Sequence, residues 1–128
     1  MYIWSYNNYD SEKTFITPSE ETRVPLKGVF YEGNPGEHSI TQEGVSLSKK
    51  GVLLTAFYVS KDGTVLRLWE QAGKGGMCDV GLIKASGFKR AYPCNLRNEI
   101  TDNTGIEIVN DSFSFKIHAN KPASFILK

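Results

Sequence analysis

The sequence has little of the chemistry on which catalytic and metal sites depend. Its 128 residues include two histidines, His38 and His118, and two cysteines. No HExxH motif, paired-histidine spacing or histidine–cysteine cluster occurs, so we expect neither a metal ion nor another cofactor in this chain. The Gly-x-Ser-x-Gly elbow of serine hydrolases is also missing. These absences remove the commonest sequence signatures of an enzyme.

The two cysteines, Cys78 and Cys94, are too few for a disulfide framework or a zinc knuckle. Each lies in a run that predicts a strand, which leaves a bridge between neighbouring strands geometrically open. We favour the other interpretation, in which both are small buried apolar side chains.

The chain also lacks a charge bias and a long apolar run. Its 15 basic and 14 acidic side chains give a formal net charge of +1. No basic stripe is present that would neutralise several phosphates, so we expect no nucleic-acid partner. No apolar run approaches the roughly 20 residues that span a bilayer, so we expect no membrane partner. The N-terminal residues lack the features of a signal peptide, and the localisation stays open.

Short β-type runs separated by turn residues dominate the rest of the sequence. Such spacing predicts an all-β, antiparallel β-sandwich of about seven to nine short strands. We expect one domain over residues 1–128, in which residues 1–40 are less regular and could form the edge of a preceding domain. The predicted strands are residues 44–48, 52–59, 65–70, 77–83, 90–96, 106–109, 113–117 and 123–127.

Several of these runs carry more detailed predictions. Residues 52–59 are dense in β-branched and aromatic side chains, which indicates a strand buried on much of both faces. The pair Asp62-Gly63 predicts a hairpin to residues 65–70. The pair Asn110-Asp111 predicts a second hairpin. Its inward-facing side chains should be Ile106, Ile108, Phe113, Phe115 and Ile117.

The N-terminal third gives weaker signals. Thr17 or Ser19 could cap a single helical turn, and residues 34–36 (Asn-Pro-Gly) predict a tight turn. No stretch of ten residues shows helical periodicity.

Neither the glycines nor the carboxylates define a catalytic site. The glycine-rich residues 73–76 suggest a phosphate cradle, but a phosphate loop requires a Lys-Ser/Thr pair that opens a helix. Here a strand follows, so we predict a plain loop. Glycosidic hydrolysis usually needs two facing carboxyl groups, and none of the 14 acids stands out as half of such a pair. We therefore assign no catalytic residue.

Aromatic side chains supply the remaining candidate site. The period-two pattern places Arg67 and Trp69 on one face of their strand and the flanking leucines on the other. If the leucines face the core, Trp69 lies outside, where Arg67 could stack on it. We name Trp69, Arg67, Tyr92 and Trp4 as candidate contacts with carbohydrate or with another domain. The alternative, which we favour for Trp69, is that a neighbouring loop or another domain covers it.

The order of the segments also resembles a known family. Residues 51–56, then 60–63, then Leu66-Arg67-Leu68-Trp69-Glu70 with Gly73, are similar to the C-terminal β-sandwich of α-mannosidase-like glycoside hydrolases (glycoside hydrolase family 38 and relatives). Residues 91–97 and 122–127 resemble later strands of the same region. The resemblance covers roughly residues 44–127.

This resemblance implies a role without catalysis. In that family the zinc ligands and catalytic aspartates belong to an N-terminal domain to which nothing in this chain corresponds. The expected function is therefore that of a non-catalytic accessory domain, whose partner is the catalytic domain of the same polypeptide. The alternative is a stand-alone carbohydrate-binding module that uses exposed aromatic side chains. In either case we expect that the chain by itself is not an enzyme.

Overall fold

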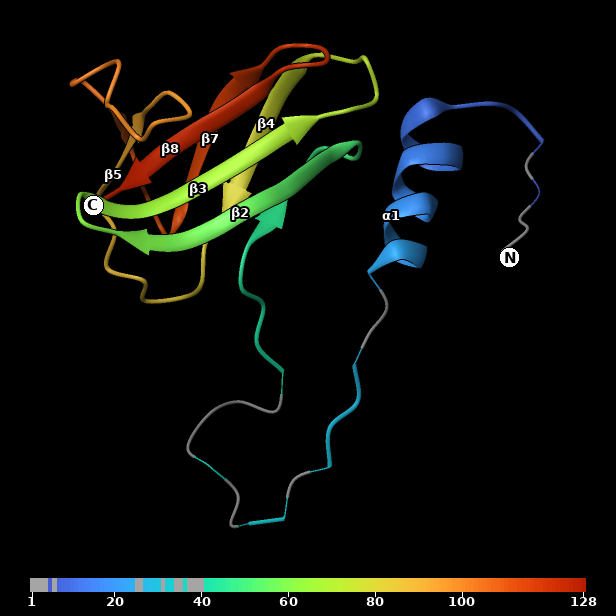
Figure 1. Cartoon of the computed structure of the whole chain (residues 1–128), viewed down its shortest axis with the longest axis horizontal. Helices are drawn as coiled ribbons and strands as arrows, with labels where there is room; N and C mark the ends of the chain where they lie inside the picture. The colour runs from blue at the N-terminus through green and yellow to red at the C-terminus, as the bar shows by residue number, and fades with distance from the viewer. Residues whose placement is uncertain (1–4, 6, 25–26, 31, 34–35, 37–40) are drawn as a thin grey trace.

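The computed structural model describes residues 5, 7–24, 27–30, 32–33, 36 and 41–128 (Figure 1). A π-helical segment, Ser11–Ile16, continues into the helix α1, Thr17–Arg23. The described strands are β1 (Ser46–Leu47), β2 (Val52–Ser60), β3 (Gly63–Glu70), β4 (Gly76–Gly81), β5 (Arg90–Pro93), β6 (Ile106–Glu107), β7 (Ser112–Ile117) and β8 (Pro122–Leu127). The helical segments in this part of the chain are too short and too polar to cross a bilayer.

The described strands form two antiparallel sheets that pack face to face. One sheet has three strands in the order β1-β4-β7, and the other has five in the order β2-β3-β8-β5-β6. All of the strand pairs are antiparallel. This arrangement confirms the predicted all-β antiparallel sandwich.

The main core lies between the sheets and is built by alternate side chains of the strands. Leu66 and Leu68 of β3 are fully buried there, as the period-two pattern predicts. Phe113 and Phe115 of β7 meet Phe125 of β8, and the ring centroids of Phe115 and Phe125 are 4.8 Å apart at 70°. These ring contacts place β7 across from β8. Edge-to-face geometry of this kind adds to the stabilisation that apolar burial provides.

The predicted turn at Asn110-Asp111 is present, and its inward face is right, but the two arms do not continue as a paired hairpin. β6 pairs with β5 in one sheet and β7 pairs with β4 in the other, so the turn crosses between the sheets. Only the bridge between Val109 and Ser112 joins its two arms. Ile108 and the three inward residues of β7 are buried, while Ile106 is half-buried. Alternation along each arm reports the buried face but does not report which strand lies beside it.

The helical region is longer than predicted and begins earlier. Its cap is Asp10, whose carboxylate accepts hydrogen bonds from the N–H groups of Glu12 and Lys13 at 3.0 Å. The predicted caps at Thr17 and Ser19 are therefore wrong. The helical segments contain no buried residue. Helical periodicity is absent from the sequence because this helix lies on the surface without burying an apolar stripe.

Both cysteines are free and buried, in agreement with the favoured prediction. Cys78 belongs to the core between the sheets, whereas Cys94 packs with Val65 and Ile126 on the outer face of the five-stranded sheet. Burial raises the pKa of both thiols, which keeps them protonated and poorly nucleophilic at neutral pH. Residues 34 and 35 of the predicted Asn-Pro-Gly turn lie outside the described residues.

Candidate functional site

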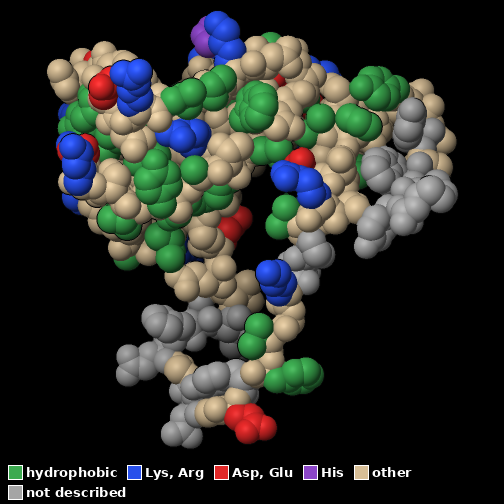
Figure 2. Space-filling view, viewed as in Figure 1, with side chains coloured by type: hydrophobic (Ala, Val, Ile, Leu, Met, Phe, Trp, Pro, Cys, Tyr) green, Lys and Arg blue, Asp and Glu red, His purple; other side chains and the backbone are tan. Residues whose placement is uncertain are grey.

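One edge of the five-stranded sheet carries several exposed large apolar side chains. β2 forms this edge, and none of its nine residues is charged. Apolar side chains of both β2 and β3 are exposed to solvent near this edge (Figure 2). We call this surface the apolar edge: Leu54, Phe57, Tyr58, Val59 and Trp69, which are 44%, 45%, 42%, 83% and 46% exposed.

This exposure contradicts the prediction that β2 is buried on much of both faces. Opposite partners in an antiparallel pair share a face. Leu54 pairs with Leu68 and Phe57 pairs with Leu66, so both side chains lie on the core side of the sheet. They are nevertheless exposed because the three-stranded sheet is narrower, and its strand β1 is only two residues long.

A β-bulge lets both halves of β2 present apolar side chains. The register with β3 shifts between Leu54 and Ala56, and the hydroxyl of Thr55 donates to the carbonyl oxygen of Arg67 at 3.1 Å. Because the extra residue reverses the alternation, Phe57 rather than Ala56 continues the inner side. Tyr58 pairs with Val65 and lies on the outer face.

Trp69 lies on the outer face, half exposed, at one wall of a surface groove. The groove has a volume of about 490 Å³. Leu53 and Gln71 line it beside the indole, and Glu20 and Arg23 of α1 line the opposite wall. An apolar ring among hydrogen-bonding side chains can bind either an apolar partner or a polar ligand with one apolar face.

Arg67, the second predicted contact, is used inside the fold. Its guanidinium donates to the hydroxyl of Ser124 at 3.1 Å, to the side-chain oxygen of Asn98 at 3.1 Å and to the carbonyl oxygen of Leu96 at 3.3 Å. Asn98 also donates its amide N–H to the phenol oxygen of Tyr58 at 3.1 Å. Arg67 therefore ties the loop after β5 to the sheet, instead of stacking on Trp69.

The other two predicted contacts do not join Trp69. Tyr92 is half-buried, and the ammonium group of Lys128 lies 5.8 Å from its ring centroid. Gly105 packs so closely against this ring that a Cβ atom there would come within 2.8 Å of it. Trp4 lies outside the described residues. Among the predicted contacts that the structure describes, only Trp69 offers an open aromatic face.

Glu70 is a residue whose importance the sequence did not reveal. Its side chain is fully buried, and its carboxylate accepts hydrogen bonds from four backbone N–H groups: Ala72 at 2.9 Å, Gly73 at 3.1 Å, Lys74 at 3.1 Å and Asn120 at 2.8 Å. Burial raises the pKa of this carboxyl, but the four donors outweigh that effect and the net pKa is lowered.

These bonds explain the glycine-rich loop. Its converging N–H groups do form an anion cradle, and the anion is the chain's own Glu70. The prediction of a plain loop therefore holds, and an acidic residue placed directly before a glycine-rich turn is the signal that would have identified this contact.

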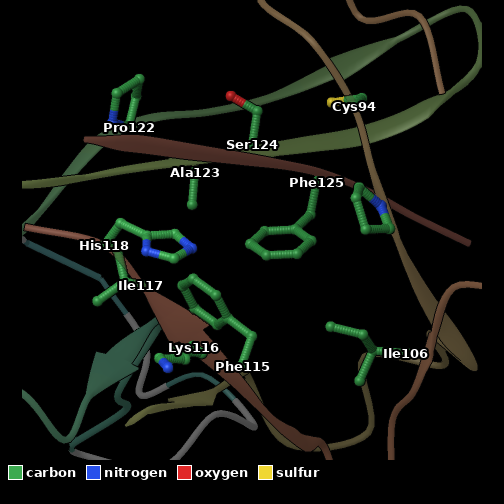
Figure 3. A pocket seen from close by; sticks show the side chains of 11 residues that line it. Cys94, Ile106, Phe115, Lys116, Ile117, His118, Pro122, Ala123, Ser124 and Phe125 are labelled. Carbon is green, nitrogen blue, oxygen red and sulfur yellow. The ribbon is translucent and has the colours of Figure 1, made fainter. Parts of the chain in front are cut away.

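A second hollow lies between the two sheets, and no sequence motif points to it. It has a volume of about 330 Å³ (Figure 3). Side chains of Phe115, His118, Ala123, Phe125 and Ile106 point toward it. These residues come from three separate strands and one turn, so only the assembled topology brings them together.

The described residues show no metal centre. No three His, Cys, Asp or Glu side chains among them gather closely enough to hold an ion. Comparison of the chain with protein-family models, with curated proteins and with solved structures finds no match.

Proposed function

We propose that this chain is a non-catalytic accessory β-sandwich that packs, through its apolar edge, against the catalytic domain of an α-mannosidase-like glycoside hydrolase. The observation that carries the proposal is the exposure of four large apolar side chains along an uncharged edge strand. Natural sheets usually protect a free edge with charge, proline or a covering segment. An unprotected apolar edge is typical of a surface that a partner covers.

The direction of the exposure supports packing rather than catalysis. Phe57 and Val59 lie on the core side of β2, where they would complete the interior if a further layer extended the three-stranded sheet. A docked domain would supply that layer. Fully burying an exposed large aliphatic or aromatic side chain is favourable by about 1.5–3 kcal/mol, so covering the half-exposed side chains of the apolar edge would favour docking.

The experiment is a binding measurement between separately produced domains. The protein of residues 1–128 is mixed with an α-mannosidase catalytic domain, and association is followed by analytical ultracentrifugation. We expect Val59→Lys to weaken the complex by at least about tenfold, since it buries an unpaired charge. Val109→Lys is the matched control, because Val109 is also exposed, at 57%, but lies outside the apolar edge. Equal affinity of the two variants would refute docking through this edge.

A carbohydrate-binding module remains the second candidate function, because the Trp69 groove also contains the side chains of Glu20, Arg23 and Gln71. Such groups bind sugar hydroxyls while the indole packs on the apolar face of the sugar ring. Calorimetry with mannose-containing oligosaccharides separates the two proposals. Saturable heat that disappears in Trp69→Ala supports the module, and absence of heat in the unmodified chain leaves packing as the function.

A further inference from the structure

The hollow between the sheets follows from their unequal widths. β7 is an edge strand of the three-stranded sheet and lies across from β8. β5 and β6 extend the other sheet beyond β8, so they have no facing strand in the described part of the chain. The space at the free edge of β7 is the cavity of about 330 Å³. This volume is within the range of small-molecule sites, which is about 300–1,000 Å³.

Its walls are suited to a flat ring. Phe115 and Phe125 meet edge-to-face with their centroids 4.8 Å apart, and both rings border the cavity. Ala123 contributes only a methyl group between His118 and Phe125 (Figure 3). Ile106 closes the opposite side. A ligand ring placed here would contact aromatic and aliphatic carbon on several sides.

The polar groups at the cavity favour a negatively charged ligand over a positively charged one. The imidazole of His118 points into the cavity, and its N–H can donate a hydrogen bond in either protonation state (Figure 3). Lys116 also borders the cavity, but its side chain lies on the exposed outer face of β7 and points away from the cavity (Figure 3). None of the described lining residues is acidic. The site therefore complements a negatively charged group beside an apolar ring.

From these features, we propose that the cavity binds a small aromatic carboxylate. The ring occupies the space beside Phe115 and Phe125, and the carboxylate accepts a hydrogen bond from His118. This site is separate from the apolar edge, because none of the side chains that form the edge borders the cavity. Its test is therefore independent of the proposed packing function.

The probes are phenylacetate and its uncharged analogue 2-phenylethanol, each titrated into the full chain and followed by two-dimensional NMR. We expect saturable shifts at Phe115, His118, Ala123 and Phe125 with a Kd of about 1 mM for phenylacetate, the affinity typical of a fragment of about ten heavy atoms. The alcohol should bind at least about fivefold more weakly, because hydrogen bonds to a charged acceptor are stronger.

Three variants locate the binding. His118→Ala should weaken phenylacetate about fivefold and the alcohol by less than about twofold. Lys84→Ala, which removes an exposed cation outside the cavity lining, should change neither affinity. Ala123→Leu should abolish the saturable shifts by filling the cavity; if this variant does not fold, the comparison of His118→Ala with Lys84→Ala decides. Equal binding of acid and alcohol, or shifts that do not saturate at these residues, would overturn the proposal.

Discussion

At the scale of single residues, Glu70 shows how a charge can be buried without an opposite charge. Four backbone N–H groups point at its carboxylate, three from the loop after β3 and one from Asn120 in the turn before β8. One side chain therefore fixes two loops at the same end of the sandwich. Because its partners are backbone groups, no change of a neighbouring side chain except a change to proline removes them.

Replacing Glu70 by Gln should destabilise the chain by about 2–3 kcal/mol, since hydrogen bonds to a charged group are strong and the amide leaves buried donors poorly paired. Urea unfolding followed by circular dichroism measures this loss. Glu70→Asp is the control for charge, because it keeps the carboxylate but shortens the side chain. Its stability should lie between that of the unmodified chain and that of Glu70→Gln. A Gln variant as stable as the unmodified chain would contradict this account of the loop.

The same carboxylate predicts a pH dependence. Its pKa is lowered from the ordinary value of 4.5 in the folded chain, so its stabilisation is complete above that value. The stabilisation is lost as the pH falls below 4.5 and through the lower folded-state pKa. Unfolding measured from pH 7 to pH 3 should show a steeper loss for the unmodified chain than for Glu70→Gln. Parallel curves would rule out Glu70 as a source of acid sensitivity.

At the scale of elements, the sequence predicted the positions of the strands well, but it predicted poorly which strands lie beside or cover one another. Each of the eight predicted runs overlaps one of the described strands, because alternation and turn residues act within a few positions. The predicted hairpin between β2 and β3 is also present, although its turn is Lys61-Asp62 and Gly63 already pairs with Ser60. The exposure of β2 was missed because an apolar run reads the same way in a covered strand and in an uncovered edge strand.

For the candidate site, too, the sequence predicted local orientation but not long-range contacts. The outward orientation of Trp69 follows from period-two alternation, so the sequence was sufficient to predict it. The interactions of Arg67 and Tyr92 depend on loops far away in the sequence, at Asn98 and Gly105. No local pattern carries that information.

Two leucines on the same side of the sheet should differ strongly in how much stability is lost when each is replaced by alanine. Leu66 is fully buried, so Leu66→Ala should cost about 2–5 kcal/mol, which is usual for a large-to-small change in a core. Leu54 is 44% exposed, and Leu54→Ala should cost less than about 1 kcal/mol. Urea denaturation midpoints test both values. Equal costs would mean that the inner face of β2 is covered in the isolated chain.

At the scale of the whole molecule, the sandwich and the helical segment are joined by polar contacts. Asp10 pairs with Lys74 and Glu12 pairs with Lys49, each at 2.8 Å, and the hydroxyl of Ser11 donates to the carbonyl oxygen of Ala72 at 2.9 Å. The buried core residues all lie in the strands and in the loops between them. The sandwich therefore contains its own core without the helix.

A chain of residues 44–128 should consequently fold by itself, with a cooperative urea transition near that of the full chain. No residue of the helical segment is itself buried, so its removal takes none of its side chains from the core. Circular dichroism and NMR dispersion check the fold, and removal of residues 122–128 is the contrasting deletion, which should leave the chain unfolded. Failure of residues 44–128 to fold would show that the sandwich depends on the N-terminal region.

The central position of β8 has a consequence for the order of folding. β3 and β5 are both paired with β8, which is the one described strand that joins them in the five-stranded sheet. During synthesis the β2–β3 hairpin can form early, yet its apolar face must wait uncovered until β8 is made. Long-range pairing of this kind slows folding, and apolar surface stays exposed until the pairing is complete. The newly made chain therefore passes through an aggregation-prone interval, which a chaperone or an already folded neighbouring domain would shorten.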